Sequence, residues 1–246
     1  MKKEKIRKVK LGVNVDHIAT LREARGTSYP DPVVGALLAE YAGCDSIVTH
    51  LREDRRHIKE RDVFLIKKAI KIPLNLEMST NKDIVIFAKN LSPDQATLVP
   101  EKRQELTTEG GIDLIGNYKK IEKVVNILKK EGIKVSLFID PVTKQVKAAK
   151  DLNVDLIEFN TGQFSEAKTP KASAKEARKI KDAVDFAKKL NFPVAVGHGL
   201  DYENIKSVLK IKGIEELNIG HSIICRSLFT GLVSAVEEIL DMIGKR

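Results

Sequence analysis

Eight short apolar runs recur along the whole chain, and each is followed by a stretch with helical spacing. The runs are continuous rather than alternating in polarity, as is typical of parallel strands buried on both faces. This rhythm predicts a parallel sheet built from βα units. We expect the strands at residues 10–15, 45–50, 72–77, 95–100, 133–139, 154–160, 193–198 and 216–221.

Helix signals occupy the spaces between these runs. The first of them has Asp31 as its expected cap, Pro32 in its first turn and Gly43 as its stop. Further helices are expected at 61–70, 81–91, 117–132, 143–152, 168–190, 201–211 and 227–245. Eight strand–helix units in 246 residues predict an α/β fold, a closed (β/α)₈ TIM barrel.

We expect residues 1–246 to form one barrel domain, with residues 1–9 as a flexible tail. The alternative is an open, doubly wound sheet. The chain lacks the glycine-rich nucleotide fingerprint that often follows the first strand of such a sheet.

The sequence predicts neither a membrane span nor an export signal. No apolar run approaches the roughly 18 residues that span a bilayer, and the basic N-terminus loses its apolar character at Asp16. We therefore predict a cytoplasmic protein. Its two cysteines, Cys44 and Cys225, lie far apart in the sequence and are expected to be reduced and buried.

The net charge of +9 has two interpretations, a nucleic-acid surface or attraction of phosphorylated metabolites. The lysine-rich segment 168–190 is the best nucleic-acid candidate. Its apolar residues recur at helical spacing and Phe186 is its single aromatic residue, so it resembles a solvated amphipathic helix without a stacking platform. We expect no nucleic-acid partner.

Polar residues gather where the expected strands end, which is where the active site of a barrel lies. All five histidines fall at strand ends or in the loops just after them, and we expect none in a helix body. Five histidines on one face of the barrel predict an active-site mouth. They are His17, His50, His57, His198 and His221.

Two other chemistries compete for this mouth. Histidines and carboxylates could bind zinc or iron, but their sequence spacing is not the one that metal sites often use. A Schiff-base enzyme needs a lysine near a strand's carboxyl end, whereas Lys10 and Lys134 stand at strand beginnings. We expect neither a metal nor an enzyme-bound imine.

Two anion sites are indicated. Glycines at 197, 199 and 220 separate the last two strands from the helices that follow, where free N–H groups bind phosphate. A second site is suggested by the basic cluster Arg52, Arg55, Arg56 and His57, although Glu53 and Asp54 compete for some of these arginines.

At these residues the sequence resembles the pyridoxine 5'-phosphate synthase family of bacterial vitamin B6 biosynthesis. The similar segments follow the family order over nearly the whole chain. They are GVNVDHIATLREARGTSYPDP (12–32), THLREDRRHIKERDV (49–63), NLEM (75–78), LVPEKRQELTTEGG (98–111), VSLFID (135–140), GHGL (197–200) and ELNIGHSII (216–224).

The resemblance implies a TIM barrel with extra helices in its βα loops, assembled as a homo-octamer. It implies an enzyme, a transferase, that condenses 1-deoxy-D-xylulose 5-phosphate with 3-amino-2-oxopropyl phosphate. Pyridoxine 5'-phosphate forms as the ring closes, inorganic phosphate and water leave, and no cofactor is needed. Imine formation, dehydration and ring closure are proton transfers, which suit several acid–base groups around one pocket.

The resemblance also implies individual roles. His50 and Glu77 correspond to proton acceptors, His198 to a proton donor and Glu158 to a group that stabilises the transition state. The deoxyxylulose phosphate is expected to contact Asp16, His17, Arg52, His57 and Thr107. The amino ketone phosphate is expected to contact Asn14, Arg25, Gly199, Gly220 and His221.

Two further expectations concern the neighbourhood of these residues. The long loop at 101–114, with paired glycines Gly110 and Gly111, is predicted to be a lid that excludes water. Some relatives carry histidine at the position of Asn160, and this difference puts only a supporting role of the residue in doubt. Another phosphosugar isomerase or synthase, or a basic RNA-binding barrel, remain alternatives.

Overall fold

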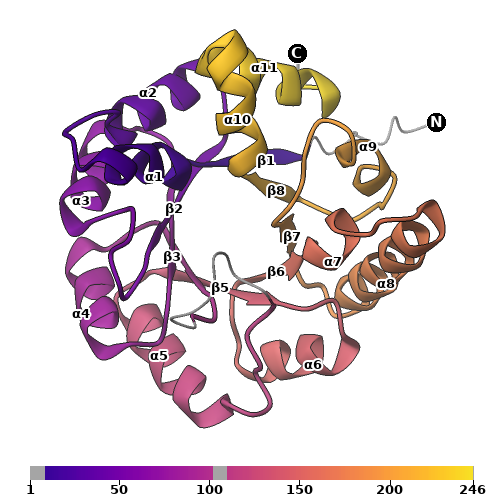
Figure 1. The fold of residues 1–246 in the computed structure, drawn as a ribbon. Coiled ribbons are helices and arrows are strands. Elements are labelled where there is room, and N and C mark those ends of the chain that lie inside the picture. The colour runs from indigo at the N-terminus through magenta and orange to yellow at the C-terminus, as the bar shows by residue number, and fades with distance from the viewer. Residues whose placement is uncertain (1–8, 102–109, 246) are drawn as a thin grey trace, which may run out of the picture.

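The structure, a computed structural model, describes residues 9–101 and 110–245. Its eight strands run parallel and pair in sequence order, and β8 pairs with β1 to close the barrel (Figure 1). The strands are β1 (Lys10–Asn14), β2 (Ser46–Leu51), β3 (Leu74–Met78), β4 (Gln95–Leu98), β5 (Lys134–Ile139), β6 (Leu156–Asn160), β7 (Val194–Gly197) and β8 (Glu216–Ile219). The predicted barrel is confirmed, and the open sheet is excluded.

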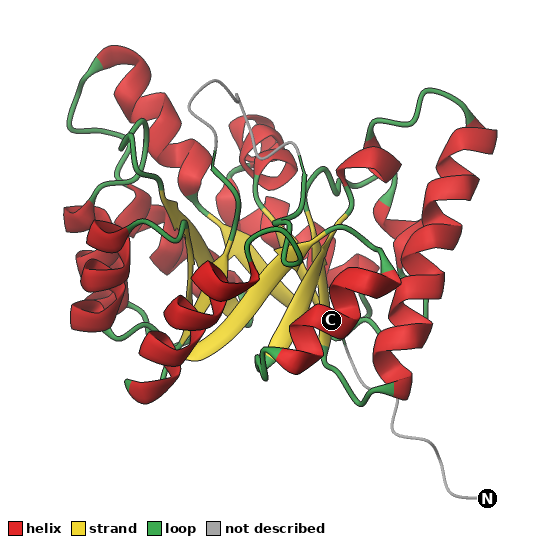
Figure 2. Cartoon of the chain, turned by 90° about the horizontal axis from the view of Figure 1, so that it is seen from below, coloured by secondary structure: helices red, strands yellow, loops and turns green. Residues whose placement is uncertain are grey.

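Helices surround the sheet on its outer side (Figure 2). Those between the strands are α2 (Pro32–Ala42), α3 (Glu60–Ala69), α4 (Lys82–Leu91), α5 (Tyr118–Lys130), α6 (Thr143–Asp151), α8 (Pro170–Lys189) and α9 (Ile205–Val208). The expected start of α2 is confirmed, since the Asp31 carboxylate accepts a 2.9 Å hydrogen bond from the Val33 N–H.

Extra helices follow three of the strands: α1 (Asp16–Arg25), α7 (Gly162–Ser165) and α10 (His221–Thr230). The expectation that no histidine lies in a helix was therefore wrong. His17 and His221 occupy the first turns of α1 and α10, which begin almost directly at the strand ends. Both histidines still lie at the mouth of the barrel, because a helix that starts there presents its first turn to it.

The C-terminal region also differs from its prediction. One helix was expected over 227–245, but the chain breaks at Gly231, whose φ of 80° is left-handed, into α10 and α11 (Leu232–Met242). The expected helix at 201–211 shortens to α9, because Asp201 and Asn204 instead form a side-chain-capped turn.

The two faces of the sheet bury different kinds of side chain. Apolar residues pack between the sheet and the helices, where the two buried faces meet. Inside the barrel, polar side chains such as Asn75, Thr97, Ser136 and Glu158 are buried. Val9 packs against the core, so the expected tail ends before it, and the rest of that tail lies outside the described residues.

Strand register brings the predicted chemical groups to one level of the barrel. His50 on β2 is level with Glu77 on β3, and Asn160 on β6 is level with Gly197 on β7. These pairs stand at or next to the carboxyl ends of their strands. Distant sequence positions therefore meet at the mouth.

Two smaller expectations have mixed outcomes. Cys44 is buried as predicted, but Cys225 on α10 is exposed, because the apolar face of that helix is carried by Ile223 and Ile224. In the described part of the chain, no helix combines the length and apolar character needed to cross a membrane.

Candidate active site

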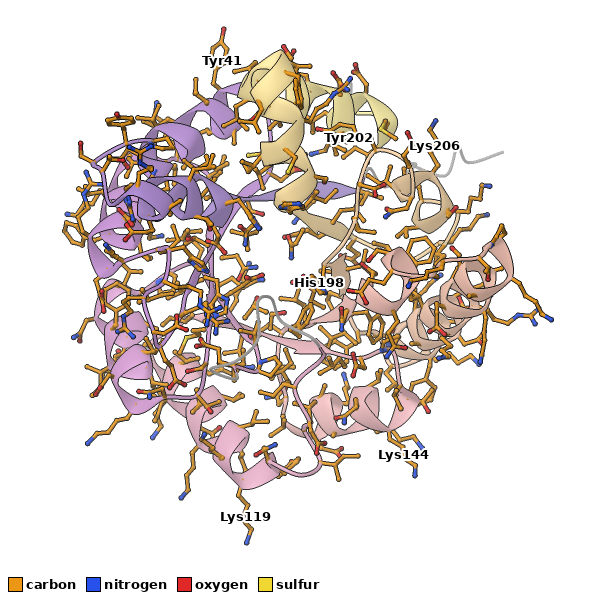
Figure 3. The ribbon with its side chains drawn as sticks, viewed as in Figure 1. Tyr41, Lys119, Lys144, His198, Tyr202 and Lys206 are labelled. Carbon is orange, nitrogen blue, oxygen red and sulfur yellow. The ribbon has the colours of Figure 1, made fainter. Side chains whose placement is uncertain are left out.

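A cavity of about 220 Å³ opens at the carboxyl ends of the strands. Figure 3 shows His198 at the centre of the barrel, whereas the labelled Lys119, Lys144 and Lys206 point outward from its rim. The residues lining the cavity come from strands across the barrel and from the start of α10. They are Asn14, His17, Glu77, Val99, Phe138, Glu158, His198, Gly199, Leu200, Asp201, Asn218, Ile219, Gly220, His221 and Ser222.

Two carboxyl groups face this cavity from β3 and β6. Burial raises the pKa of Glu77 well above its usual range, and the charges of Glu158 and Asp16 raise it further. Burial likewise raises the pKa of Glu158 to about 8, against a 2.6 Å hydrogen bond from the Asn218 amide that lowers it. The pair therefore retains a proton at neutral pH and can both donate and accept one.

This raised pKa predicts an unusual pH dependence of stability. The folded protein binds a proton at Glu158 that the unfolded chain releases above about pH 4.3, so the free energy of unfolding falls as pH rises toward 8. Glu158→Gln removes this loss. We expect the variant to exceed the parent in stability by on the order of 2 kcal/mol at pH 8 and by much less at pH 5.

Urea unfolding at both pH values measures the effect. Glu122→Gln, on the exposed face of α5, removes the same charge without burial and serves as the matched control. An equal stability difference for Glu158→Gln at pH 5 and pH 8 contradicts the assignment of a raised pKa.

His198 is held in a strained backbone conformation. Its φ of 76° lies in the left-handed region, which costs a residue with a Cβ on the order of 1 kcal/mol. The Thr161 hydroxyl lies 2.6 Å from the His198 carbonyl oxygen and 2.8 Å from that of Gly197, and it stabilises this turn. The strain directs the imidazole toward the cavity. Burial lowers the pKa of His198, while Glu166 raises it.

The other four histidines form two ring pairs at the mouth. The rings of His17 and His221 are 4.7 Å apart, and those of His50 and His57 are 6.2 Å apart. Burial lowers the pKa of His17 and of His57, and the nearby Asp16 opposes it in both cases. These two imidazoles are therefore mainly neutral at pH 7.

Asp16 connects this group to the sheet. Its carboxylate accepts a 3.0 Å hydrogen bond from the Thr49 hydroxyl, a 2.9 Å bond from the His50 N–H and a 2.9 Å bond from the Asn14 amide. Asp16 thus orients the first two strand ends, and its contact with a ligand stays a prediction.

His50 has a carboxylate partner that the sequence did not assign. Its Nε2 lies 2.9 Å from Oε1 of Glu101, and the other oxygen of Glu101 accepts a 2.9 Å bond from the Glu53 N–H. Burial alone would raise the pKa of Glu101, but the bond and charge of His50 lower it. Glu101 is therefore ionised, and Nε2 of His50 is the donor.

The basic cluster after β2 is largely neutralised by acids. Arg56 pairs with Asp54 at 2.7 Å and Arg55 with Glu60 at 2.6 Å, so these two arginines stabilise the loop. Arg52 is 4 % exposed, contacts Asp54 and lines a separate hollow beside the main cavity. The same hollow is lined by Glu53, Asp54, Asp83 and Glu101, so an anion site at Arg52 stays a prediction.

Arg22, in the opening segment of the chain, is structural. It forms a bidentate ion pair with Asp62, with hydrogen bonds of 2.8 and 2.9 Å, and donates a 3.0 Å hydrogen bond to the His57 carbonyl oxygen. This buried pair anchors the loop that carries His57.

The expected anion site after the last two strands has suitable geometry. Gly220 caps α10, and Gly199, Gly220 and Ser222 all line the cavity. A Cβ on Gly220 would lie 2.8 Å from that of Asn14, so a side chain at 220 would crowd this wall. Because the first N–H groups of a helix have no partner within that helix, the start of α10 suits an anion.

The structure brings together eight of the predicted site residues around the main cavity: Asn14, His17, Glu77, Glu158, His198, Gly199, Gly220 and His221. Asp16, His50, Arg52 and His57 lie beside it without lining it. Arg25 is exposed in the last turn of α1. Thr107 and most of the expected lid fall outside the described residues.

Within 9–101 and 110–245, no three histidine, cysteine or acidic side chains are placed to bind one ion. The sequence places Glu101, Asn218 and Asp140 at strand ends, but it did not predict that they pair with His50, Glu158 and Asn160.

Comparison with known proteins identifies the relatives. Residues 11–245 match the family model described as "Pyridoxal phosphate biosynthesis protein PdxJ". Pyridoxine 5'-phosphate synthase from Coxiella burnetii is 51% identical over 96% of this chain and 98% of its own. The protein of that name from Geobacter sulfurreducens is 49% identical over 95% and 98%.

Among solved structures, thiamine phosphate pyrophosphorylase from Pyrococcus furiosus aligns with a TM-score of 0.62. The alignment covers 97% of each chain at 16% identity, so it shows a shared barrel fold alone.

Proposed function

The chain belongs to the PdxJ family of pyridoxal phosphate biosynthesis proteins, and we propose that it synthesises pyridoxine 5'-phosphate. The proposed substrates are 1-deoxy-D-xylulose 5-phosphate and 3-amino-2-oxopropyl phosphate. Their condensation closes the pyridine ring and releases inorganic phosphate and water.

One observation carries most weight: Glu77, Glu158 and His198 line the same cavity as the start of α10. The first three are groups that can transfer protons, and the helix start suits a phosphate. Ring formation from two phosphorylated ketones requires both features in one place. The reaction needs no electron transfer, and acid–base groups are sufficient for each step.

We assign the roles accordingly. Glu77 and His50 accept protons, His198 returns them to departing groups, and Glu158 stabilises charge that develops during ring closure. His198 and Glu77 line the cavity, whereas His50 acts from beside it, next to Arg52 and His57.

We propose two phosphate positions. The amino ketone phosphate would bind at Gly199, Gly220 and His221, which line the cavity beside the start of α10. We propose that the deoxyxylulose phosphate binds toward Arg52, which is buried, and His57. Two separate phosphate positions would let both substrates bind at once.

A homo-octamer is also proposed, from the family resemblance, and a cytoplasmic location, from the sequence. Sedimentation of the purified chain measures the first, and fractionation of cells measures the second.

A product assay tests the function. The purified protein receives both phosphates, and pyridoxine 5'-phosphate is followed by absorbance and mass while inorganic phosphate is counted. One phosphate is expected per product. Omission of either substrate is the control, and failure to form product from both contradicts the proposal.

The Glu101 pair yields a separate prediction. Glu101→Gln retains the shape but replaces the carboxylate that accepts the hydrogen bond from His50 Nε2, so turnover should fall about 10- to 100-fold. Glu53→Gln is the matched control, because Glu53 contacts Ser79 and Asn81 rather than His50. Equal turnover of Glu101→Gln and the parent removes Glu101 from the mechanism.

A further inference from the structure

Three side chains from the ends of neighbouring strands form a hydrogen-bonded series that leads to His198. Asp140 follows β5, Asn160 ends β6 and His198 follows β7. The Asn160 amide nitrogen lies 3.1 Å from Asp140 Oδ1, and Asn160 Oδ1 lies 3.1 Å from His198 Nδ1. Asn160 is 5 % exposed, so these contacts lie within the protein.

The orientation of the Asn160 amide is determined by its other partners. Its Oδ1 also lies 2.9 Å from the backbone N–H of Gly162, which can only donate. Its nitrogen faces the Asp140 side chain, whose Oδ1 accepts a 3.0 Å bond from the Gly111 N–H as well. In a flipped amide, the Asn160 nitrogen would face the Gly162 N–H, donor against donor. Its oxygen would face Asp140 Oδ1, acceptor against acceptor.

This orientation decides which nitrogen of His198 carries the proton. An amide oxygen only accepts, so Nδ1 of His198 must be the donor. In the neutral ring, Nε2 then has a lone pair and no proton. It can accept a proton from a substrate, but it has none to give.

The imidazole is also confined mechanically. A Cβ on Gly162 would lie 2.8 Å from His198 Nδ1, so the backbone of Gly162 packs closely against the ring. The Phe138 ring meets it edge-on at 6.5 Å. With the backbone turn stabilised by Thr161, these contacts restrict a ring flip that would exchange the two nitrogens.

We propose that Asn160 and Asp140 are positioning residues that hold His198 in its Nδ1–H form, so that this histidine acts as a base before it acts as an acid. Nε2 first takes a proton from a substrate, giving an imidazolium. In a later step a C–O bond of the intermediate breaks with its electron pair on oxygen. The imidazolium returns its proton to that oxygen, water departs and His198 is neutral again.

The proposal rests on the proposed function for the identity of the reaction, but the protonated nitrogen can be measured without it. We would record long-range ¹H–¹⁵N spectra of the full chain with ¹⁵N-labelled histidine rings, at a pH where His198 is neutral. His198→Gln assigns its signals. A proton on Nδ1 is expected, and a proton on Nε2 overturns the proposal.

Kinetics provide the second test. Asn160→Leu removes both amide contacts, and we expect turnover to fall about 10- to 100-fold with KM within a few-fold. In the His198→Gln background the same change should cost little more, because Asn160 acts through that ring. Asn75→Leu is the matched control, a buried asparagine bonded to Thr97, and its effect should add to that of His198→Gln.

A swap of the two polar groups keeps the test informative if Asn160→Leu folds poorly. The double variant Asp140→Asn with Asn160→Asp retains an acceptor facing Nδ1 and a hydrogen bond between the two positions. It should recover most of the turnover that Asp140→Asn alone loses. If the loss of turnover caused by Asn160→Leu adds fully to the loss caused by His198→Gln, the positioning role is contradicted. A parent protein that forms no product, yet shows the Nδ1 proton, contradicts the proposed function and leaves the tautomer established.

Discussion

Glu77→Gln should reduce turnover by at least about 100-fold while the affinity for each phosphate substrate stays within a few-fold. The reason lies in the position of Glu77, which lines the cavity at the level of His50 on the neighbouring strand β2. Burial and the charges of Glu158 and Asp16 raise its pKa well above the usual carboxyl range, so the group can hold a proton and transfer it. The amide retains the shape and the hydrogen-bonding capacity but cannot exchange that proton.

Turnover per folded site, substrate affinity and melting temperature should be measured together. Mixing both substrates with the variant is expected to trap an unclosed adduct, which mass spectrometry detects. If the variant mainly weakens binding or lowers the melting temperature while turnover per folded site is intact, Glu77 has a structural role and the assignment is wrong.

His198→Ala should retain the fold and the binding of deoxyxylulose phosphate, yet lose at least about two decades of turnover. The loss follows from the removal of the imidazole that the turn between Gly197 and Gly199 directs into the cavity. Alanine also adopts the left-handed conformation at some cost, so the melting temperature is measured beside the rate.

Thr161→Val is the companion variant, because it loosens the same turn while leaving the imidazole in place. Its turnover should lie between those of the parent and His198→Ala. Near-normal turnover of His198→Ala would take this histidine out of the acid–base set.

The repeated strand–helix pattern was sufficient to predict the barrel, because buried parallel strands have a local signature of continuous apolar residues. The same pattern predicted the mouth. Once a residue such as Glu77 or His198 is placed at a strand's carboxyl end, the closure of the barrel decides where it faces. Helix ends were harder to predict. The apolar spacing continues across Gly231, so the sequence alone did not show that a helix ends there.

What the sequence determined by itself was therefore which residues reach the mouth. Only the tertiary structure decided which of them touch: Glu101 with His50, Asn218 with Glu158, and Asn160 with His198. Each pair joins segments that are separated by 38 or more positions in the chain. Periodicity reports only on neighbours within a helix or strand, whereas pKa and tautomer depend on burial and on partners that meet when the sheet closes.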